Sequence, residues 1–469
     1  DKRNLQLLRR VAVIYLPYLL ITIFFYWSRF IYFPSIFDTM SRIDSIGSTL
    51  NTFDESFTGS LLNLFSRMLV DLIYSTLQVW TSAIIDYEGF TFQRKVAWFA
   101  FGLGVVLAAF FAFFHDTHEK ETPDHSSPVW MLIVGFGSFI LAGLPIWAIG
   151  KEVSTGGWND RFALAPMLGA VLMVIALLVW FVRPGGQKLI LSFMLVFSIA
   201  AQVWVVNNYR HDWRTQLDFY WQLHWRAPAL QSGTAVFSFE QPSPSVTHFS
   251  HAGFALNVLY HYQTEDGSLP YWYFARQWRF EYQPNDPFIY RLRGLEFHGN
   301  TSNGIAVLHQ GGGACLRVLD SVYARDPLYK DGQDILIPVS DPARIIPDPQ
   351  ALPPDPDIFG PEPVRDWCYF FEKADLARQT KDWKTAIALY RQAKQQGYAP
   401  GYGAEYIPFI EAYAQTGDWQ TAYDLTRAAQ KQNGGLKEML CNNWARLSET
   451  PSADVKIVEQ ARETLACSE

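Results

Sequence analysis

The sequence is poor in charged residues and in cysteine. Asp, Glu, Lys and Arg make up 18% of the 469 residues, the net charge is −7, and there are four cysteines. No long tract of Lys and Arg is present, which argues against nucleic acid as the main partner. Phosphate-binding loops, GxSxG, HExxH and Cys-x-x-Cys are also missing. The sequence therefore gives no support to the common nucleotide-binding, serine-hydrolase or zinc-enzyme classes, and no metal site is predicted.

Long apolar runs dominate the first 206 residues. A membrane-spanning helix needs about 20 mainly apolar residues, and in hydrocarbon the backbone must satisfy its own hydrogen bonds. Five runs meet this need: Val11–Phe30, Val96–Phe114, Val129–Ile149, Ala163–Val182 and Leu189–Val206. Glycines such as Gly104, Gly135 and Gly169 are expected to let these helices pack closely. We predict a polytopic α-helical membrane bundle over residues 1–206, with the lipid bilayer as a partner.

A sixth segment, Leu61–Ile85, is ambiguous. It carries Arg67 and Asp71 four residues apart, on one helical face. The segment either spans the bilayer with this pair facing the bundle or lies in the interface as an amphipathic helix. Six spans put the polar half in the cytoplasm and satisfy the positive-inside rule, whereas five spans put it outside.

The polar half begins with an aromatic segment, residues 207–232. Helical spacing relates Trp213, Leu217, Tyr220, Trp221 and His224. One apolar face of this kind predicts a helix that lies on the membrane surface or one that packs on the next domain. We assign the segment as a membrane-surface helix and keep packing on the next domain as the alternative.

Residues 233–363 are predicted to form a small β-rich domain. Short alternating runs (TAVFSF, ALNVLYHY, YWYFARQWRFEY, IAVLHQ and ACLRVLD) are separated by turn residues such as DGS, PND and GN. This pattern is typical of strands and turns. The Pro-rich end of the domain, Pro338–Pro363, predicts an extended linker or a loop held against a neighbour.

Residues 364–469 are predicted to be helical and internally repeated. KDWKTAIALYRQA (381–393) aligns with GDWQTAYDLTRAA (417–429) at a spacing of 36 residues. The recurring Trp, Ala and Leu resemble the tetratricopeptide repeat, of which about two copies are recognisable. Such repeats bind a protein partner or serve a structural role, and both interpretations remain open.

The cysteines all lie in the polar half. Cys315, Cys368, Cys441 and Cys467 form an even number, which predicts the disulfides Cys315–Cys368 and Cys441–Cys467. Disulfides imply an oxidising, extracytoplasmic compartment. The alternative is four buried free thiols.

A family resemblance enters at Asn159–Val171, NDRFALAPMLGAV. This segment resembles one near the last spans of the O-mannosyltransferases with tetratricopeptide repeats, a branch of the GT-C glycosyltransferases. Asp160, Arg161, Pro166 and Gly169 occupy the matching places. The resemblance implies a polyprenyl-phosphate sugar donor, whose phosphate Arg161 or Arg183 would bind, and it allows for a divalent metal.

The same family carries an acidic motif in its first outer loop. Here FDESF, with Asp54 and Glu55, is similar to that motif, and Asp38 is a second candidate for the general base. The alternative is that Asp54 and Glu55 stabilise the start of the following helix. The chain begins at Asp1 rather than Met, so the catalytic half of such an enzyme is also expected upstream.

Two functions follow from these features. The first is a membrane glycosyltransferase-like protein that moves a sugar from a polyprenyl-linked donor to an envelope acceptor. The alternative is a non-enzymatic envelope or membrane-complex subunit that docks proteins through its repeats. Either would be an integral protein of a bacterial-type cell membrane with its soluble half outside the cytoplasm.

Overall fold

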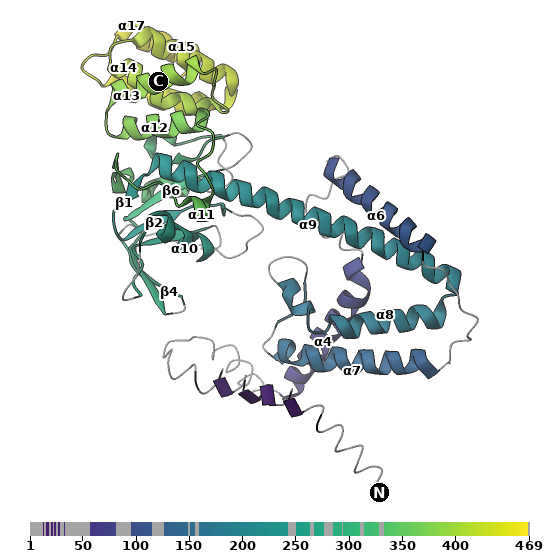
Figure 1. Cartoon of the computed structure of the whole chain (residues 1–469). Helices are drawn as coiled ribbons and strands as arrows, with labels where there is room; N and C mark the ends of the chain where they lie inside the picture. The colour runs from purple at the N-terminus through teal and green to yellow at the C-terminus, as the bar shows by residue number, and fades with distance from the viewer. Residues whose placement is uncertain are drawn as a thin grey trace.

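The structure is a computed structural model. It describes residues 57–80, 95–114, 126–148, 151–154, 159–242, 250–262, 267–275, 285–292, 294–309, 314–327 and 333–467, together with single positions between 13 and 32. Most of the expected span Val11–Phe30 therefore lies outside the described residues. The described chain has an apolar helical part and a polar part, joined by one long helix (Figure 1).

The apolar part contains two pairs of helices and a further helix, α4. Helix α6 lies along α9, and α7 lies along α8, whereas α4 contacts α7 (Figure 1). The bounds are α4 Phe57–Ile73, followed by the π-helical turn η2 Tyr74–Gln78, α6 Lys95–Phe114, α7 Ser126–Ala148, the 3-10 turn η3 Asn159–Ala163, α8 Met167–Phe181 and α9 Pro184–Arg226.

Two stretches of the described chain are long and apolar enough to cross a membrane. They are Pro128–Trp147 and a stretch within Pro184–Arg226, and the apolar segments Lys95–Phe110 and Met167–Phe181 are shorter. Many large apolar side chains of these helices are exposed, including Trp130, Leu141 and Phe193. The expected bundle of five or six spans is therefore reduced to two candidate spans within the described residues.

Glycines bring the paired helices together. A Cβ atom on Gly169 of α8 would lie 2.5 Å from the carbonyl oxygen of Gly135 in α7, and one on Gly104 of α6 would lie 2.8 Å from the carbonyl oxygen of Val196 in α9. A real Cβ does not tolerate such distances, so only glycine permits this approach. Close packing through glycine is confirmed at these positions.

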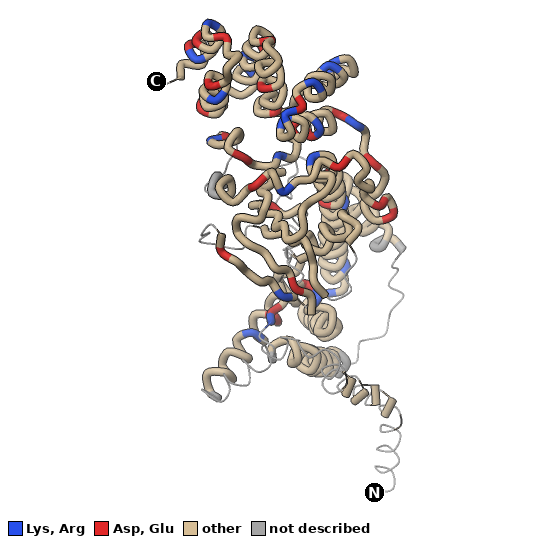
Figure 2. Tube along the Cα trace, turned by 90° about the vertical axis from the view of Figure 1, so that its left-hand side faces the viewer, with Lys and Arg blue, Asp and Glu red and all other residues tan. Residues whose placement is uncertain are grey.

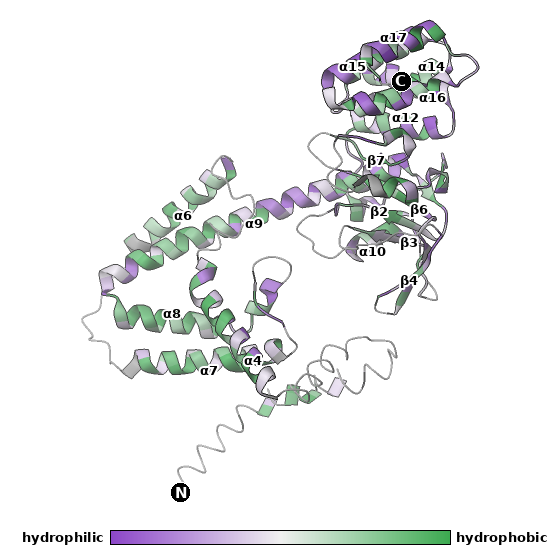
Figure 3. Cartoon of the chain, turned by 180° about the vertical axis from the view of Figure 1, so that it is seen from behind, coloured by the Kyte–Doolittle hydropathy of each residue, from purple (hydrophilic) through white to green (hydrophobic). Residues whose placement is uncertain are grey.

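Helix α9 is one continuous element of 43 residues, about 65 Å long at 1.5 Å per residue. Its first half is apolar and its second half polar (Figure 3). Phe219–Arg226 are buried in the polar part, whereas Trp213 is exposed. The membrane-surface interpretation of residues 207–232 is thus wrong for the end of this segment, which packs on the next domain because its aromatic side chains fill that domain's core.

The domain after α9 is built on a mixed four-stranded sheet in the order β3-β2-β6-β7. Strand β2 runs parallel to both β3 and β6, and β6 pairs antiparallel with β7. The strands are β2 Thr234–Phe237, β3 Tyr271–Phe274, β6 Gly304–Leu308 and β7 Arg317–Val318. A hairpin of β4 Pro287–Leu292 and β5 Leu295–Asn300 packs beside this sheet.

One expected strand is a helix. The run ALNVLYHY falls largely in α10, Ser250–Leu259. Parallel strands need a crossover connection, and α10 supplies it between β2 and β3. Ala252, Leu256 and Leu259 form its buried face. The domain is therefore an α/β domain rather than a purely β-rich one.

The Pro-rich segment is held against its neighbours. The 3-10 turn η4 Ser321–Tyr323 precedes the segment, and the 3-10 turn η5 Gln333–Val339 leads into it. The segment itself contains the 3-10 turn η6 Pro342–Arg344, strand β8 Ile345–Ile346 and the short helix α11 Pro356–Phe359. Strand β8 pairs with β1 Ala229–Leu230. The Phe359 carbonyl accepts a 3.1 Å hydrogen bond from Trp221 Nε1 of α9. The loop interpretation is confirmed at this contact.

The last hundred residues form three helix pairs. They are α12 Trp367–Gln379 with α13 Trp383–Gln395, α14 Ile407–Gln415 with α15 Trp419–Gln432, and α16 Lys437–Ser448 with α17 Val455–Leu465; the 3-10 turns η7 Gly403–Tyr406 and η8 Gly434–Leu436 precede α14 and α16. The aligned sequence segments are α13 and α15. Each is preceded by an N-cap Asp whose carboxylate accepts a 3.1 Å bond from a Thr N–H three residues later. Sequence comparison missed the third pair.

Both expected disulfides are present. Cys315 is bonded to Cys368, and Cys441 is bonded to Cys467. The first disulfide joins the α/β domain to α12, and the second ties the end of the chain to α16. The prediction from the cysteine count is confirmed, and the free-thiol alternative is wrong.

Candidate functional site

The three candidate catalytic carboxylates, Asp38, Asp54 and Glu55, lie outside the described residues. The two arginines expected at the donor phosphate are described and exposed. Arg161 precedes α8 and Arg183 follows it, so the 15-residue helix separates them by about 22 Å. The structure does not bring these two side chains to one phosphate.

Arg67 and Asp71, the polar pair of the segment Leu61–Ile85, both contact residues at or just after the end of α7. Asp71 is buried, where it accepts a 2.7 Å bond from Trp147 Nε1 and a 3.0 Å bond from the Val153 N–H. Arg67 forms a 2.9 Å ion pair with Glu152. Both residues thus fix the turn after α7 instead of pairing with each other, which is a structural role.

A polar cavity of about 250 Å³ opens beside the second half of α9. Residues of one helical stripe, among them His211, Asp218 and Gln222, line it from α9. His309, which follows β6, and Asp366, at the start of α12, line it from the other side. The cavity thus lies where α9, the α/β domain and the first helix pair meet.

The groups around this cavity differ in charge. Partial burial and the neighbouring carboxylate of Asp366 raise the pKa of Asp218 above its usual range, against the opposing effect of Arg214. Burial lowers the pKa of His309 to about 4, so its imidazole is neutral at pH 7. Gln222 is buried, and its Oε1 accepts a 2.6 Å bond from the Leu316 N–H. The cavity therefore combines negative charge with neutral polar groups.

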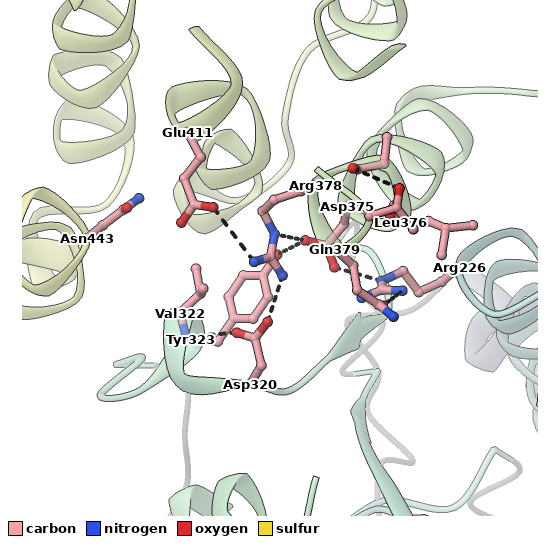
Figure 4. A network of polar contacts seen from close by, with 12 residues as sticks. Arg226, Asp320, Val322, Tyr323, Asp375, Leu376, Arg378, Gln379, Glu411 and Asn443 are labelled. Atoms are coloured by element: carbon pink, nitrogen blue, oxygen red, sulfur yellow. Dashed lines mark hydrogen bonds and ion pairs between the residues drawn. The ribbon is translucent and has the colours of Figure 1, made fainter. Parts of the chain in front are cut away.

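A second cluster of charged residues, most of them buried, lies where α9 ends. Figure 4 shows Arg378 of α12 surrounded by carboxylates, with Arg226, the last residue of α9, on the far side of Asp375. Arg226 Nε and Arg378 Nε each lie 2.7 Å from an oxygen of Asp375, and Arg378 Nη2 lies 2.7 Å from Asp320 Oδ2. Glu411 of α14 completes the group 3.7 Å from Arg378 Nη1. We call these five residues the junction network.

The junction network joins three parts of the chain electrostatically. Arg226 and Asp375 have fully buried side chains. Burial raises the pKa of Asp375, but the charges of Arg378 and Arg226 outweigh burial and hold it at about 2. The carboxylate is therefore ionised, and α9, the α/β domain and the helix pairs are linked by charges that are fully buried at Arg226 and Asp375 and mostly buried at Arg378, Glu411 and Asp320.

None of the family models, curated proteins or solved structures compared with the chain matches it. Within the described residues there is also no group of three or more His, Cys, Asp or Glu side chains placed to hold a metal. Function is therefore inferred from the geometry of the chain itself.

Sequence reasoning missed both the cavity and the junction network. Arg226 was visible only as a basic residue after an aromatic run, and Asp375 and Arg378 as charges on a predicted helix. A spacing of three on one helix indicates a surface pair as readily as a buried one. The signal that distinguishes them is burial by distant segments.

Proposed function

We propose that this protein is anchored in a bacterial-type cell membrane and holds its disulfide-bonded half outside the cytoplasm as a rigid scaffold for a partner protein. The observation that carries the proposal is α9, which runs without interruption from the apolar helices into the junction network. A helix fixed by burial at one end and packed on α6 at the other transmits a defined orientation.

The charge distribution supports this division of the chain. Asp, Glu, Lys and Arg are concentrated beyond the apolar helices, which are nearly free of them (Figure 2). Since all four cysteines are paired, the polar half suits an oxidising compartment. The disulfide pairing outweighs the charge bias of the loops, because that bias favours a cytoplasmic polar half only if the chain has six spans.

The docking part of the proposal rests on the helix pairs. They stack at the end of the molecule farthest from the apolar helices (Figure 1). Stacked helix pairs present an extended surface, and this kind of surface commonly binds proteins. The test is purification from native membranes in mild detergent. A complex of fixed stoichiometry is expected, and a purified monomer that transfers sugar from a polyprenyl-phosphate donor would contradict the scaffold.

The membrane topology is testable because the chain contains no cysteine outside its two disulfides. Arg161→Cys and Arg183→Cys each introduce one thiol at an exposed position, and Asp424→Cys marks the polar half. If the candidate span in α9 crosses the bilayer, an impermeant maleimide added to intact cells labels Asp424→Cys but not Arg183→Cys; if the shorter helix α8 crosses as well, it also labels Arg161→Cys. Labelling of all three variants would show that these helices do not span.

Glycosyl transfer is the second candidate, and Arg161 favours it. If the shorter helix α8 crosses the bilayer as well as α9, the start of α8 and the end of α9 lie on the same side of the membrane, and exposed Arg161 faces the compartment of the disulfide-bonded half. A lipid-linked phosphate on that side would reach Arg161 but not Arg183. Loss of transfer in Arg161→Ala, with activity retained in Arg183→Ala, would support this candidate over the scaffold.

A further inference from the structure

The cavity beside α9 has an excess of negative charge. Asp218 is exposed and makes no hydrogen bond or ion pair with any described residue, and the nearby charge of Arg214 offsets only part of the effect of partial burial and of Asp366 on its pKa. Asp366 lines the same cavity, and one of its oxygens already accepts the Cys368 N–H at 3.0 Å. Two carboxylates of this kind repel each other, and a cation between them removes the repulsion.

The other lining groups distinguish an organic cation from a metal ion. Neutral His309 offers one acceptor nitrogen and one donor, and the Nε2 group of buried Gln222 has no partner among the described residues. The described part of the chain offers no metal-binding group of three or more ligands. An ammonium group differs from a metal because its three N–H donors match separate acceptors around a cavity wall.

We infer that this cavity binds a small ligand through a primary ammonium group held between Asp218 and Asp366. The volume of about 250 Å³ exceeds the roughly 30 Å³ of a water-sized group, so the ligand carries further atoms beyond the ammonium. Gln222 Nε2 at the wall suits a ligand that also carries oxygen, and Thr215 Oγ1, which donates to the His211 carbonyl, is able to accept a bond from a ligand hydroxyl. Ethanolamine is the simplest compound that combines these features.

The position of the cavity offers two sources of this group. His211 at its rim lies five residues beyond Val206, where the apolar run ends, which is about 8 Å along the helix. The ammonium therefore belongs either to a free amine or to the headgroup of an aminophospholipid in the adjacent leaflet. The lipid source rests on the proposed membrane anchoring, whereas binding of free ethanolamine does not.

Calorimetric titration of the full chain in detergent micelles tests the inference. Ethanolamine should bind, and choline, which has the same charge but no N–H donor, should bind at least about tenfold more weakly. Asp218→Asn should weaken ethanolamine binding by at least about tenfold because it removes one of the two negative charges. Asp424→Asn, an equivalent change on the exposed face of α15, should leave binding unchanged.

Three results would overturn the inference: no binding of ethanolamine, equal binding by Asp218→Asn, or equal binding of choline. Thermal unfolding of Asp218→Asn checks its fold, which should be intact because the native side chain makes no bond. Nanodiscs then separate the sources. If a lipid headgroup occupies the site, free ethanolamine should bind the wild-type protein more weakly in phosphatidylcholine discs that contain phosphatidylethanolamine than in discs of phosphatidylcholine alone. If the source is a free amine, the affinity for ethanolamine should be the same in these two kinds of disc.

Discussion

Replacing Arg226 with Met tests whether the junction network holds α9 to the polar half. The change removes a buried cation 2.7 Å from Asp375 while keeping a long side chain. Removal of one partner of a buried pair costs about 3–5 kcal/mol, because the other charge stays buried. Asp375 retains Arg378 and a 2.9 Å bond from the Tyr323 hydroxyl. We therefore expect the lower end, about 3 kcal/mol, or roughly a 150-fold change in the folding equilibrium.

The assay is guanidinium unfolding of the full chain in detergent, followed by near-ultraviolet circular dichroism. The aromatic side chains buried in the polar half, such as Trp272 and Trp444, report on its packing. Arg365→Met is the matched control because Arg365 pairs with Glu362 at the surface, 3.0 Å away and more than half exposed. An exposed pair contributes less than about 1 kcal/mol, so this control should unfold almost as the wild type does.

A double-mutant cycle identifies the partner. Arg226→Met combined with Asp375→Asn should show a coupling of at least about 1 kcal/mol, since the two side chains are in direct contact. Equal stability of Arg226→Met and Arg365→Met would refute the claim that the junction network fixes α9. A coupling near zero would refute the assignment of Asp375 as the partner.

Three further predictions concern stability. Asp375 has a pKa of about 2, below its usual 3.8, so its charged form stabilises the folded state by about 2 kcal/mol. This contribution to the free energy of unfolding is fully present above about pH 4 and is lost as the pH falls through 2, which denaturant unfolding at a series of acid pH values would show. Replacing Cys441 and Cys467 together with Ala opens a link across 26 residues and should cost about 3.5 kcal/mol in denaturant unfolding, with reductant giving no further loss at this site. Gly169→Leu should separate α8 from Gly135 of α7 and lower the thermal unfolding temperature in detergent, and an unchanged temperature would contradict their close contact.

The expected disulfides show which long-range features a sequence can specify. Four cysteines confined to the polar half, paired in order along the chain, led to the two bonds found. The helical repeat at residues 381–393 and 417–429 was likewise visible because identical capping and packing positions recur. Such features depend on residue type and spacing, which the sequence contains directly.

The expected strand at ALNVLYHY shows the limit of local patterns. Its apolar positions fit strand alternation, yet Ala252, Leu256 and Leu259 share one helical face. The segment is helical because β2 and β3 are parallel neighbours, and a parallel pair needs a crossover. Tertiary pairing of strands, which local spacing does not reveal, decided the outcome.

The sequence by itself determined the division into an apolar and a polar half, the positions of most helices and the disulfide pairs. These follow from hydropathy, capping residues and cysteine count, all of which act over short distances along the chain. Only the tertiary structure decided that α9 is a single helix ending in the core, that Arg226 meets Asp375, and that Asp218 and Asp366 share a cavity. The physical reason is that burial and charge pairing join residues about 150 positions apart, and their energies depend on which distant surfaces exclude water.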